Sequence, residues 1–319
     1  MVTVHMQIRI EEANKKLKTG EFEKAKKIFS ELLDISPENL ELISGYYIAS
    51  YWDNRLDKIL KTPEGIERGL FLNESFKRFE KDLSERKYPR TLSFESILIC
   101  VLQESCSQLR QGYQRDGKYV MTKEIMIILT ANLIRIRDYK NCSEMIDYLR
   151  KNQDIPREFY FYKAECLYHT GEHRKSRMLY RSSLLYYQEL LPLDLVESEP
   201  LSAAIYDLKK NFNDDDLKEC LPVYCIEKAY LPEMEDLTRE EVQHFASEVF
   251  RLDQSRNSVK QDILFKVENR ILHYGLNLIF TLKKEYNSDL YRKIRQKIES
   301  VDKDIIERTE ANLAARKKI

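Results

Sequence analysis

The chain has 319 residues, and its 53 basic and 53 acidic side chains give a formal net charge of zero at pH 7. Nucleic-acid-binding proteins usually carry a basic excess, because phosphate contacts supply much of their affinity, so the composition argues against a nucleic-acid partner. With only 8 Gly and 8 Pro, the chain is predicted to be all-α rather than built from sheets.

The first predicted element is a pair of helices over residues 6–18 and 21–35. Apolar residues recur at helical spacing in both segments. Gly20, between them, suits the left-handed backbone of a helix C-terminus. Pro37 cannot extend a helix interior but tolerates the start of the next helix.

Residues 40–113 are predicted to form irregular helices. Residues 40–90 indicate two long helices with a break at residues 61–65, and residues 93–113 indicate another helix. This part of the chain is either a pair of degenerate repeats or an inserted unit, and the sequence leaves both interpretations open.

One motif then occurs twice, with its copies 34 residues apart. Residues 131–142 read ANLIRIRDYKNC, and residues 165–176 read ECLYHTGEHRKS. Each copy is a helical run, a break, an acidic residue followed by an aromatic one, and then a small residue. A period of 34 residues in helix-turn-helix units is typical of tetratricopeptide (TPR) repeats.

In each predicted unit a small residue lies where two helices would cross closely, and a larger one follows to fill the gap to the next helix. The small residues are Ala25, Cys142 and Ser176, and the larger ones are Phe29, Ile146 and Tyr180.

These units resemble the TPR family, which implies a right-handed superhelical solenoid of helix pairs that binds other proteins. Three features depart from the family pattern. Arg9 replaces the aromatic residue usual early in a repeat, Arg137 stands where the turn Gly belongs, and the middle unit lacks the closing Pro. The separation of Gly20 and Arg137 is also not a multiple of 34. A generic helical protein with chance similarity is the alternative.

Residues 192–200 are acidic and contain Pro, and they are predicted to form a hinge. The hinge would separate a TPR-like domain over residues 1–191 from a C-terminal helical region over residues 201–319. In that region, Thr238 and Glu241 fit a capping box at the start of a helix. The C-terminal region is predicted to cap the last repeat, because the ends of a solenoid need a polar outer face.

The C-terminal region is expected to end in two antiparallel helices. One carries an apolar face from Leu264 to Leu282, and the second carries one from Leu290 to Ile305. The short connection at residues 286–288 makes them neighbours. A polar segment at residues 211–216 predicts a helix cap earlier in this region.

In a TPR solenoid the first helix of each pair lines a concave face, and motif position selects the candidate partner-binding residues. They are mainly apolar and aromatic, which favours a hydrophobic helix or extended segment as partner over an acidic C-terminal peptide. The candidates are Ile10, Asn14, Leu17, Lys18, Ile127, Ile134, Arg135, Phe161, Glu165, Tyr168 and His169.

No catalytic or nucleotide-binding motif is present, so neither an enzyme nor a cofactor is expected. Cys166, His169 and His173 have the spacing of one helical face, but Thr170 and Gly171 are predicted to end the helix before His173. No metal site is therefore expected. The six cysteines contain no CxxC pair.

The sequence thus predicts a non-catalytic scaffold or adaptor that binds a partner protein or peptide through a TPR groove. Residues 53–55 and 64–69 are similar to a segment of spirochaetal TPR proteins, some of which scaffold the collar of a periplasmic flagellar motor. A structural subunit of a large bacterial assembly is therefore one alternative. A regulatory TPR protein whose C-terminal helices, residues 258–316, cover its groove is the other.

No run of 18 apolar residues is present, so no membrane span is expected. The N-terminus shows no charged start followed by an apolar stretch, which predicts a cytoplasmic protein. A periplasmic location stays open if the chain is trimmed, and the oligomeric state stays undetermined.

Overall fold

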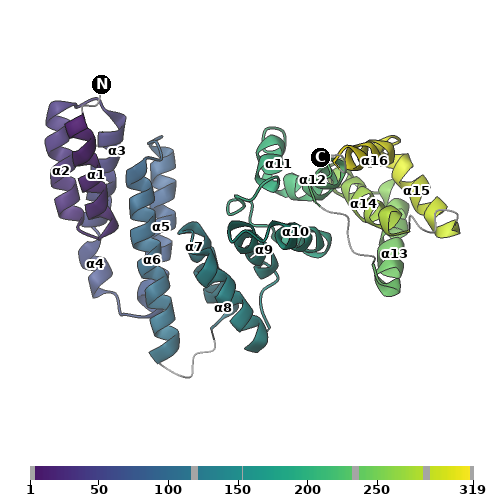
Figure 1. Ribbon diagram of the computed structural model, residues 1–319, viewed down its shortest axis with the longest axis horizontal. Helices are drawn as coiled ribbons and strands as arrows, with labels where there is room; N and C mark the ends of the chain where they lie inside the picture. The colour runs from purple at the N-terminus through teal and green to yellow at the C-terminus, as the bar shows by residue number, and fades with distance from the viewer. Residues whose placement is uncertain (1–3, 116–120, 153, 232–236, 283–287, 317–319) are drawn as a thin grey trace. The chain divides into compact units, whose positions relative to one another are not determined.

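The computed structural model describes residues 4–115, 121–152, 154–231, 237–282 and 288–316 (Figure 1). Every regular element in these ranges is helical, and no β-strand occurs in them. The predicted all-α class is therefore confirmed, and the helix-on-helix packing is consistent with a helical repeat protein.

Two compact units divide the chain, Met1–Asn141 and Cys142–Ile319. We call them unit 1 and unit 2. The boundary lies within a helix and inside the predicted repeat domain of residues 1–191. The segment predicted as a hinge, residues 192–200, lies within unit 2, where Leu193 and Val196 are buried.

The helices of unit 1 differ from expectation at one place, because the first predicted helix of residues 40–90 ends early and a six-residue helix follows it. The helices are α1 (Val4–Lys18), α2 (Phe22–Ile35), α3 (Leu40–Asp53), α4 (Leu56–Lys61), α5 (Ile66–Glu85), α6 (Leu92–Arg115) and α7 (Lys123–Arg135).

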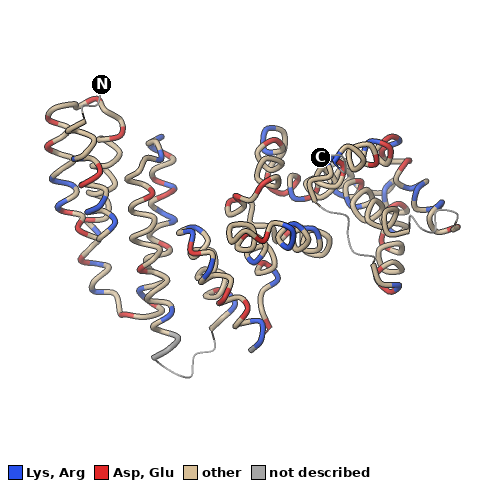
Figure 2. Tube along the Cα trace, in the orientation of Figure 1, with Lys and Arg blue, Asp and Glu red and all other residues tan. Residues whose placement is uncertain are grey.

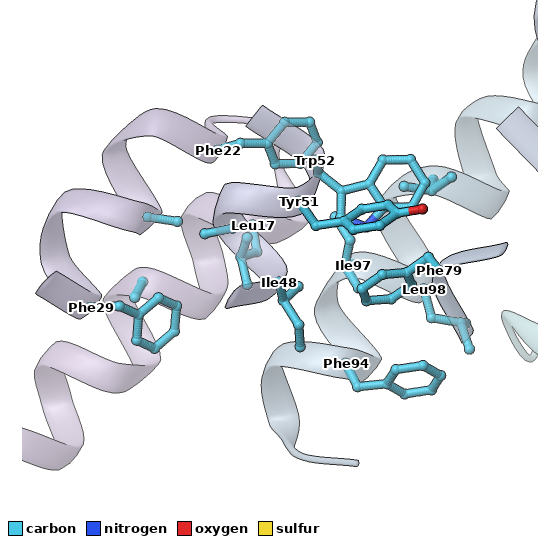
Figure 3. Packing of buried hydrophobic residues seen from close by; sticks show 14 of the residues in the cluster. Leu17, Phe22, Phe29, Ile48, Tyr51, Trp52, Phe79, Phe94, Ile97 and Leu98 are labelled. Carbon is cyan, nitrogen blue, oxygen red and sulfur yellow. The ribbon is translucent and has the colours of Figure 1, made fainter. Parts of the chain in front are cut away.

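Helix α6 organises unit 1, because it packs against α1, α3, α5 and α7. Figure 3 shows the apolar core that α1, α2, α3, α5 and α6 form, where rings from α3, α5 and α6 meet. Trp52 is fully buried, and its ring centroid lies 5.6 Å from that of Phe79 and 6.1 Å from that of Phe76. Aromatic pairs of this kind add about 0.5–1.5 kcal/mol beyond the burial of their area.

Glycines allow α5 and α6 to cross closely. A Cβ atom added at Gly112 would lie 2.7 Å from the backbone N of Ile66, closer than real Cβ contacts allow. Hydrogen bonds fix the crossing, because Gly65 N–H donates to Gln108 Oε1 over 2.7 Å and Ser105 Oγ donates to the Gly69 carbonyl over 2.8 Å. These contacts hold the N-terminal end of α5 against the C-terminal half of α6.

The helices of unit 2 follow the expected order, with one further break. The predicted last helix, residues 290–305, ends at Val301 because Asp302 is extended, and Ile305 begins another helix. The elements are α8 (Tyr139–Asn152, which starts before the unit boundary), α9 (Phe159–His169), α10 (His173–Tyr187), the 3₁₀ helix η1 (Gln188–Leu190), α11 (Leu201–Leu208), α12 (Asp214–Glu227), α13 (Arg239–Arg256), α14 (Gln261–Thr281), α15 (Asp289–Val301) and α16 (Ile305–Arg316).

Several helix starts were predicted correctly from local sequence. Thr238 and Glu241 form a complete capping box at the start of α13. Asn213 Oδ1 accepts from the N–H groups of Asp215 and Asp216 at the start of α12. The connection predicted at residues 286–288 lies mostly outside the described residues.

In unit 2, α9 packs on α10, and α14 packs on α12, α13 and α15. One apolar cluster joins Leu185 of α10 and Val223 and Ile226 of α12 to residues of α13–α16. The C-terminal helices are therefore part of the core of this unit.

The turn that ends the first helix of each predicted repeat has one backbone geometry. Gly20, Arg137 and Gly171 have φ angles of 78°, 61° and 88°. Each donates its N–H to the carbonyl three residues back, and the next residue donates to the carbonyl five residues back, over 2.8–3.1 Å. This is a Schellman cap. Helices α5 and α12 end in the same way at Lys87 and Ala229, so the cap alone does not define a repeat.

We expect Gly171→Ala to lower the free energy of unfolding by about 1 kcal/mol, because an L residue is strained at positive φ. No described atom lies within 4 Å of the Cβ that the substitution adds, so the effect isolates the backbone. Urea denaturation would measure it. Arg137→Gly should have the opposite sign, and a neutral Gly171→Ala variant would contradict the shared turn geometry.

Candidate partner-binding site

The candidate residues on α1 are mostly buried. Ile10 and Leu17 belong to the core of unit 1, and α1 packs against α6 as well as α2. Asn14 is 3% exposed, and neither polar atom of its side chain has a hydrogen-bond partner among the described residues. Only Lys18 is exposed. The face predicted to be concave in the first repeat is therefore largely covered by other helices of unit 1.

The candidates on α7 are also mainly occupied. Ile134 is buried and Ile127 is half-buried. Arg135 Nη2 donates to Glu80 Oε1 of α5 over 2.6 Å, and its guanidinium lies 5.2 Å from the centre of the Phe76 ring. Arg135 thus joins α7 to α5 inside unit 1.

The candidates on α9 divide into a buried and an accessible group. Phe161 and Glu165 are buried, whereas Tyr168 is half-buried and His169 lies at the surface. The Tyr168 ring contacts those of His169 and His173 edge-on, with centroids 5.2 and 4.7 Å apart.

Glu165 is the centre of a buried network. It is 2% exposed and accepts from the Tyr180 hydroxyl of α10 and, over 2.9 Å, from the N–H of Glu197. His169 Nε2 lies 2.9 Å from Glu165 Oε1, the oxygen that also accepts from the Glu197 N–H. Burial, and then the charge of Glu165, hold the pKa of Tyr180 well above its usual range. Glu165 therefore joins α9, α10 and the segment before α11.

Of the predicted surface, five side chains remain at least partly accessible: Lys18, Ile127, Arg135, Tyr168 and His169. They are divided between the two units. A single concave face formed by all of the candidates stays a prediction.

Lys18 lines a hollow of about 460 Å³ in unit 1. Its walls are mainly apolar side chains from five helices, including the ring of the buried Trp52, whose Nε1 has no hydrogen-bond partner among the described residues. Cys100 also lines it, and burial raises the pKa of this thiol to about 11, which makes it a poor nucleophile.

A second hollow of about 460 Å³ lies between the C-terminal halves of α3 and α5. Three arginines and two tyrosines dominate it, and none of the five is among the predicted partner-binding residues. We call it the Arg–Tyr groove, and its lining residues are Tyr47, Ser50, Tyr51, Asn54, Arg55, Arg78, Asp82 and Arg86.

Cation–π contacts order this groove. The guanidinium carbon of Arg55 lies 3.4 Å from the centre of the Tyr51 ring, and Arg55 Nη1 donates to the Tyr51 carbonyl over 2.9 Å. The guanidinium carbon of Arg86 lies 4.9 Å from the centre of the Tyr47 ring, and Arg86 Nε donates to Asp82 Oδ2 over 3.1 Å. The arrangement offers N–H donors on a rigid surface and contains no nucleophile–base pair.

No family model, curated protein or solved structure matches this chain. What the surfaces do must therefore be argued from their chemistry.

Unit 2 holds a second polar network, which joins η1, α12 and α14; Gln188, Glu219 and His273 are buried in it, and Arg270 reaches the surface. Arg270 donates to both carboxylate oxygens of Glu219, over 2.9 and 2.8 Å, and Gln188 Nε2 donates to Glu219 Oε2 over 2.5 Å. The oxygen of Gln188 is thus left as an acceptor, so His273 Nδ1, 3.0 Å away, carries a proton.

His273 stays neutral within this network. Burial, and then the charges of Arg181 and Arg270, lower its pKa to about 3. Perturbed histidines often mark active sites, but His273 is fully buried and lines neither hollow. We interpret it as a packing residue.

The described residues contain no group of three or more His, Cys, Asp or Glu side chains placed to hold a metal ion. Within the same ranges, no helix has the length and apolarity needed to cross a bilayer. Of the residues considered for a metal, Cys166 is fully buried, whereas His169 and His173 are exposed.

The sequence offered little signal for the Arg–Tyr groove. Arg55 lies four residues after Tyr51, and this i,i+4 spacing predicts their contact. Arg86 follows α5, whereas its ring partner Tyr47 lies on α3, so no local spacing predicts that contact. The approach of α3 to α5 depends on ring contacts of Tyr51 and Trp52 with Phe76 and Phe79, more than 20 residues later, which are not local.

Proposed function

We propose that this protein is a non-catalytic scaffold for protein–protein interaction, built on TPR-like helix pairs. One observation supports the proposal most strongly. After each of the turns at Gly20, Arg137 and Gly171, the fifth residue is small and buried and the ninth is large and buried. The fifth residues are Ala25, Cys142 and Ser176, and the ninth are Phe29, Ile146 and Tyr180.

This combination separates the three turns from the Schellman cap at Lys87. The residue five positions after Lys87 is Leu92, which is exposed. The shared pattern at Arg137 and Gly171 recurs after 34 residues, the TPR period. Helix-pair repeats present extended surfaces that suit protein partners, which favours a binding role over catalysis.

Charge and chemistry support the same proposal. Lys and Arg are interleaved with Asp and Glu along the helices of each unit, as Figure 2 shows. Two strongly perturbed groups, His273 and Tyr180, lie in hydrogen-bond networks that join helices, whereas hydrogen bonds to Lys24 and Lys16 lower the pKa of the accessible Glu21. A passive binding surface needs no such group to be accessible.

The test is affinity purification of the tagged full chain from its own cells after mild crosslinking, with mass spectrometry of the recovered proteins. Recovery of one assembly in fixed stoichiometry would favour a structural subunit, and recovery of several proteins that share a short segment would favour an adaptor. If wild-type protein recovers nothing above a tag-only control at two crosslinker concentrations, the scaffold proposal fails.

The autoinhibited alternative needs a different variant from a simple truncation. Removing residues 258–316 would expose Leu185, Val223 and Ile226, which share a core with the C-terminal helices. A truncated chain could then capture proteins non-specifically. A milder change is Arg308→Gln, which breaks contacts of α16 with Glu227 and Asp302 at 2.9 and 2.7 Å.

A further inference from the structure

We propose that the Arg–Tyr groove of unit 1 binds a carboxylate-rich segment of a partner protein. The inference rests on the proposed scaffold function and adds to it the surface and the chemistry of recognition. It differs from the sequence-based expectation of an apolar guest on a concave face, because the groove lies between α3 and α5 and contains none of the candidate residues.

Arg55 supplies the excess positive charge. Arg55 is half-buried, its guanidinium lies over the Tyr51 ring, and Nη1 donates a hydrogen bond to the Tyr51 carbonyl. No carboxylate within the described ranges forms an ion pair with it. A cation that is partly removed from water without a counter-charge gains from an anion brought by a partner.

The other two arginines are only weakly held. Arg78 and Arg86 pair with Glu74 and Asp82, one turn earlier on α5, over 3.2 and 3.1 Å. Exposed pairs at this spacing stabilise a helix by only a few tenths of a kcal/mol, so an incoming carboxylate can compete for the arginine donors. The three cations exceed these two carboxylates by one positive charge.

Tyrosine stacking prepares the groove for planar anions. The guanidinium groups of Arg55 and Arg86 lie over the rings of Tyr51 and Tyr47. Arg55 donates through Nη1 and Arg86 through Nε to groups of the protein, which leaves their other N–H groups as donors for a ligand. Arginine donors match the geometry of a carboxylate, and side chains already held in place lose less entropy on binding. Tyr and Arg are also the residues enriched at the energetic centres of protein interfaces.

The surroundings favour a protein segment over a nucleic acid. The chain as a whole is neutral, and its basic residues are interleaved with acidic ones on both units (Figure 2). A nucleic acid would need a row of cations along its backbone, whereas this groove offers three. Its volume of about 460 Å³ accommodates a few side chains.

The test is fluorescence anisotropy with the full chain and three labelled octapeptides. The first alternates Glu with Ser, the second replaces each Glu with Gln, and the third replaces two Glu with phosphoserine. We expect the Glu peptide to bind, the Gln peptide to bind at least about tenfold more weakly, and the affinity to fall as NaCl rises from about 50 to 500 mM.

The double variant Arg55→Gln/Arg86→Gln should lower the affinity for the Glu peptide about tenfold or more, since each change removes charge-assisted donors. Arg78→Gln provides a variant that should fold normally, because its side chain is 73% exposed, and it should weaken binding about threefold. The matched control is Arg90→Gln. Arg90 also stacks on a ring, that of Phe94 at 4.7 Å, and is 71% exposed, but it lies outside the groove.

Several results would overturn the assignment. The Glu and Gln peptides could bind equally well, or Arg90→Gln could lose as much affinity for the Glu peptide as the groove variants do. Binding of the phosphopeptide alone would be the third such result. A labelled oligonucleotide that binds to wild type but not to the double variant would identify a nucleic-acid site instead. A wild-type dimer in sedimentation that the double variant lacks would identify a second copy as the occupant.

This proposal and the scaffold proposal fail separately. If crosslinking recovers a partner in fixed stoichiometry and the Glu peptide does not bind, the scaffold stands and the groove assignment falls. If the peptide binds as expected and no partner is recovered, the scaffold proposal fails and the groove remains an anion-binding surface.

Discussion

The Glu165→Ala variant is expected to lose about 3–5 kcal/mol of the free energy of unfolding, because it removes a buried charged acceptor from several donors. The Tyr180 hydroxyl and the N–H of Glu197 would lose their partner, and the side chains of Glu165 and Tyr180 are buried. Urea denaturation followed by far-UV circular dichroism would measure the loss. Glu165→Gln keeps one acceptor oxygen and should lose less.

Glu172→Ala is the matched control in the same helix pair. Its carboxylate pairs with Lys175 at the surface and is 43% exposed, so the substitution should change the free energy of unfolding by less than about 0.5 kcal/mol. If Glu165→Ala is as stable as Glu172→Ala but fails to capture partners, Glu165 acts at a binding surface, as its motif position suggested.

The second large effect is expected with pH, through His273. Its pKa is about 3 in the folded protein against an ordinary 6.5. Between these values the unfolded chain binds a proton that the folded chain does not. Acidification through pH 6.5 therefore favours unfolding, and the penalty grows until the folded form is protonated near pH 3.

From pH 6.5 to 4.5 this penalty is about 2.7 kcal/mol, at 1.36 kcal/mol for each pH unit. His273→Gln cannot take up the proton. Between pH 7.5 and pH 4.5 its free energy of unfolding should therefore rise by about 2–3 kcal/mol relative to that of wild type. Urea denaturation at the two pH values measures the difference and cancels the titration of the carboxylates common to both proteins. The exposed His244→Gln is the control, and its difference from wild type should stay constant.

If His273→Gln follows wild type at both pH values, the imidazole must be able to charge in the folded state. Water would then reach the Glu219–Arg270–His273 network, and an active site there would have to be considered. The structure argues for the opposite, because η1, α12 and α14 enclose the histidine.

Helix ends were the most predictable part of the fold, because they depend on groups within five residues. The Thr238–Glu241 capping box and the Asn213 cap follow from side chains that reach the nearest backbone N–H groups. The helix between Leu290 and Ile305 was predicted without its break, because the apolar period continues across Asp302 while its backbone does not.

Motif position was a weaker guide to the binding surface. It placed Ile10, Asn14 and Leu17 on an open face, but α6, which begins more than 70 residues later, packs against α1, and all three are buried. Nothing in the local sequence of α1 shows which distant helix will cover it. The same holds for Glu165, whose partner Glu197 lies in a segment predicted as a hinge.

The sequence by itself determined that the chain is helical, where most helices begin and end, and that its basic and acidic charges balance. These follow from hydrogen bonds and apolar periods within a few turns. The tertiary structure alone decided that Arg55, Arg78 and Arg86 share one groove and that Gln188, Glu219, Arg270 and His273 share one hydrogen-bond network. Contacts across such sequence separations depend on how whole helices pack, as at the glycine crossing of α5 and α6, and this is a property of the complete core.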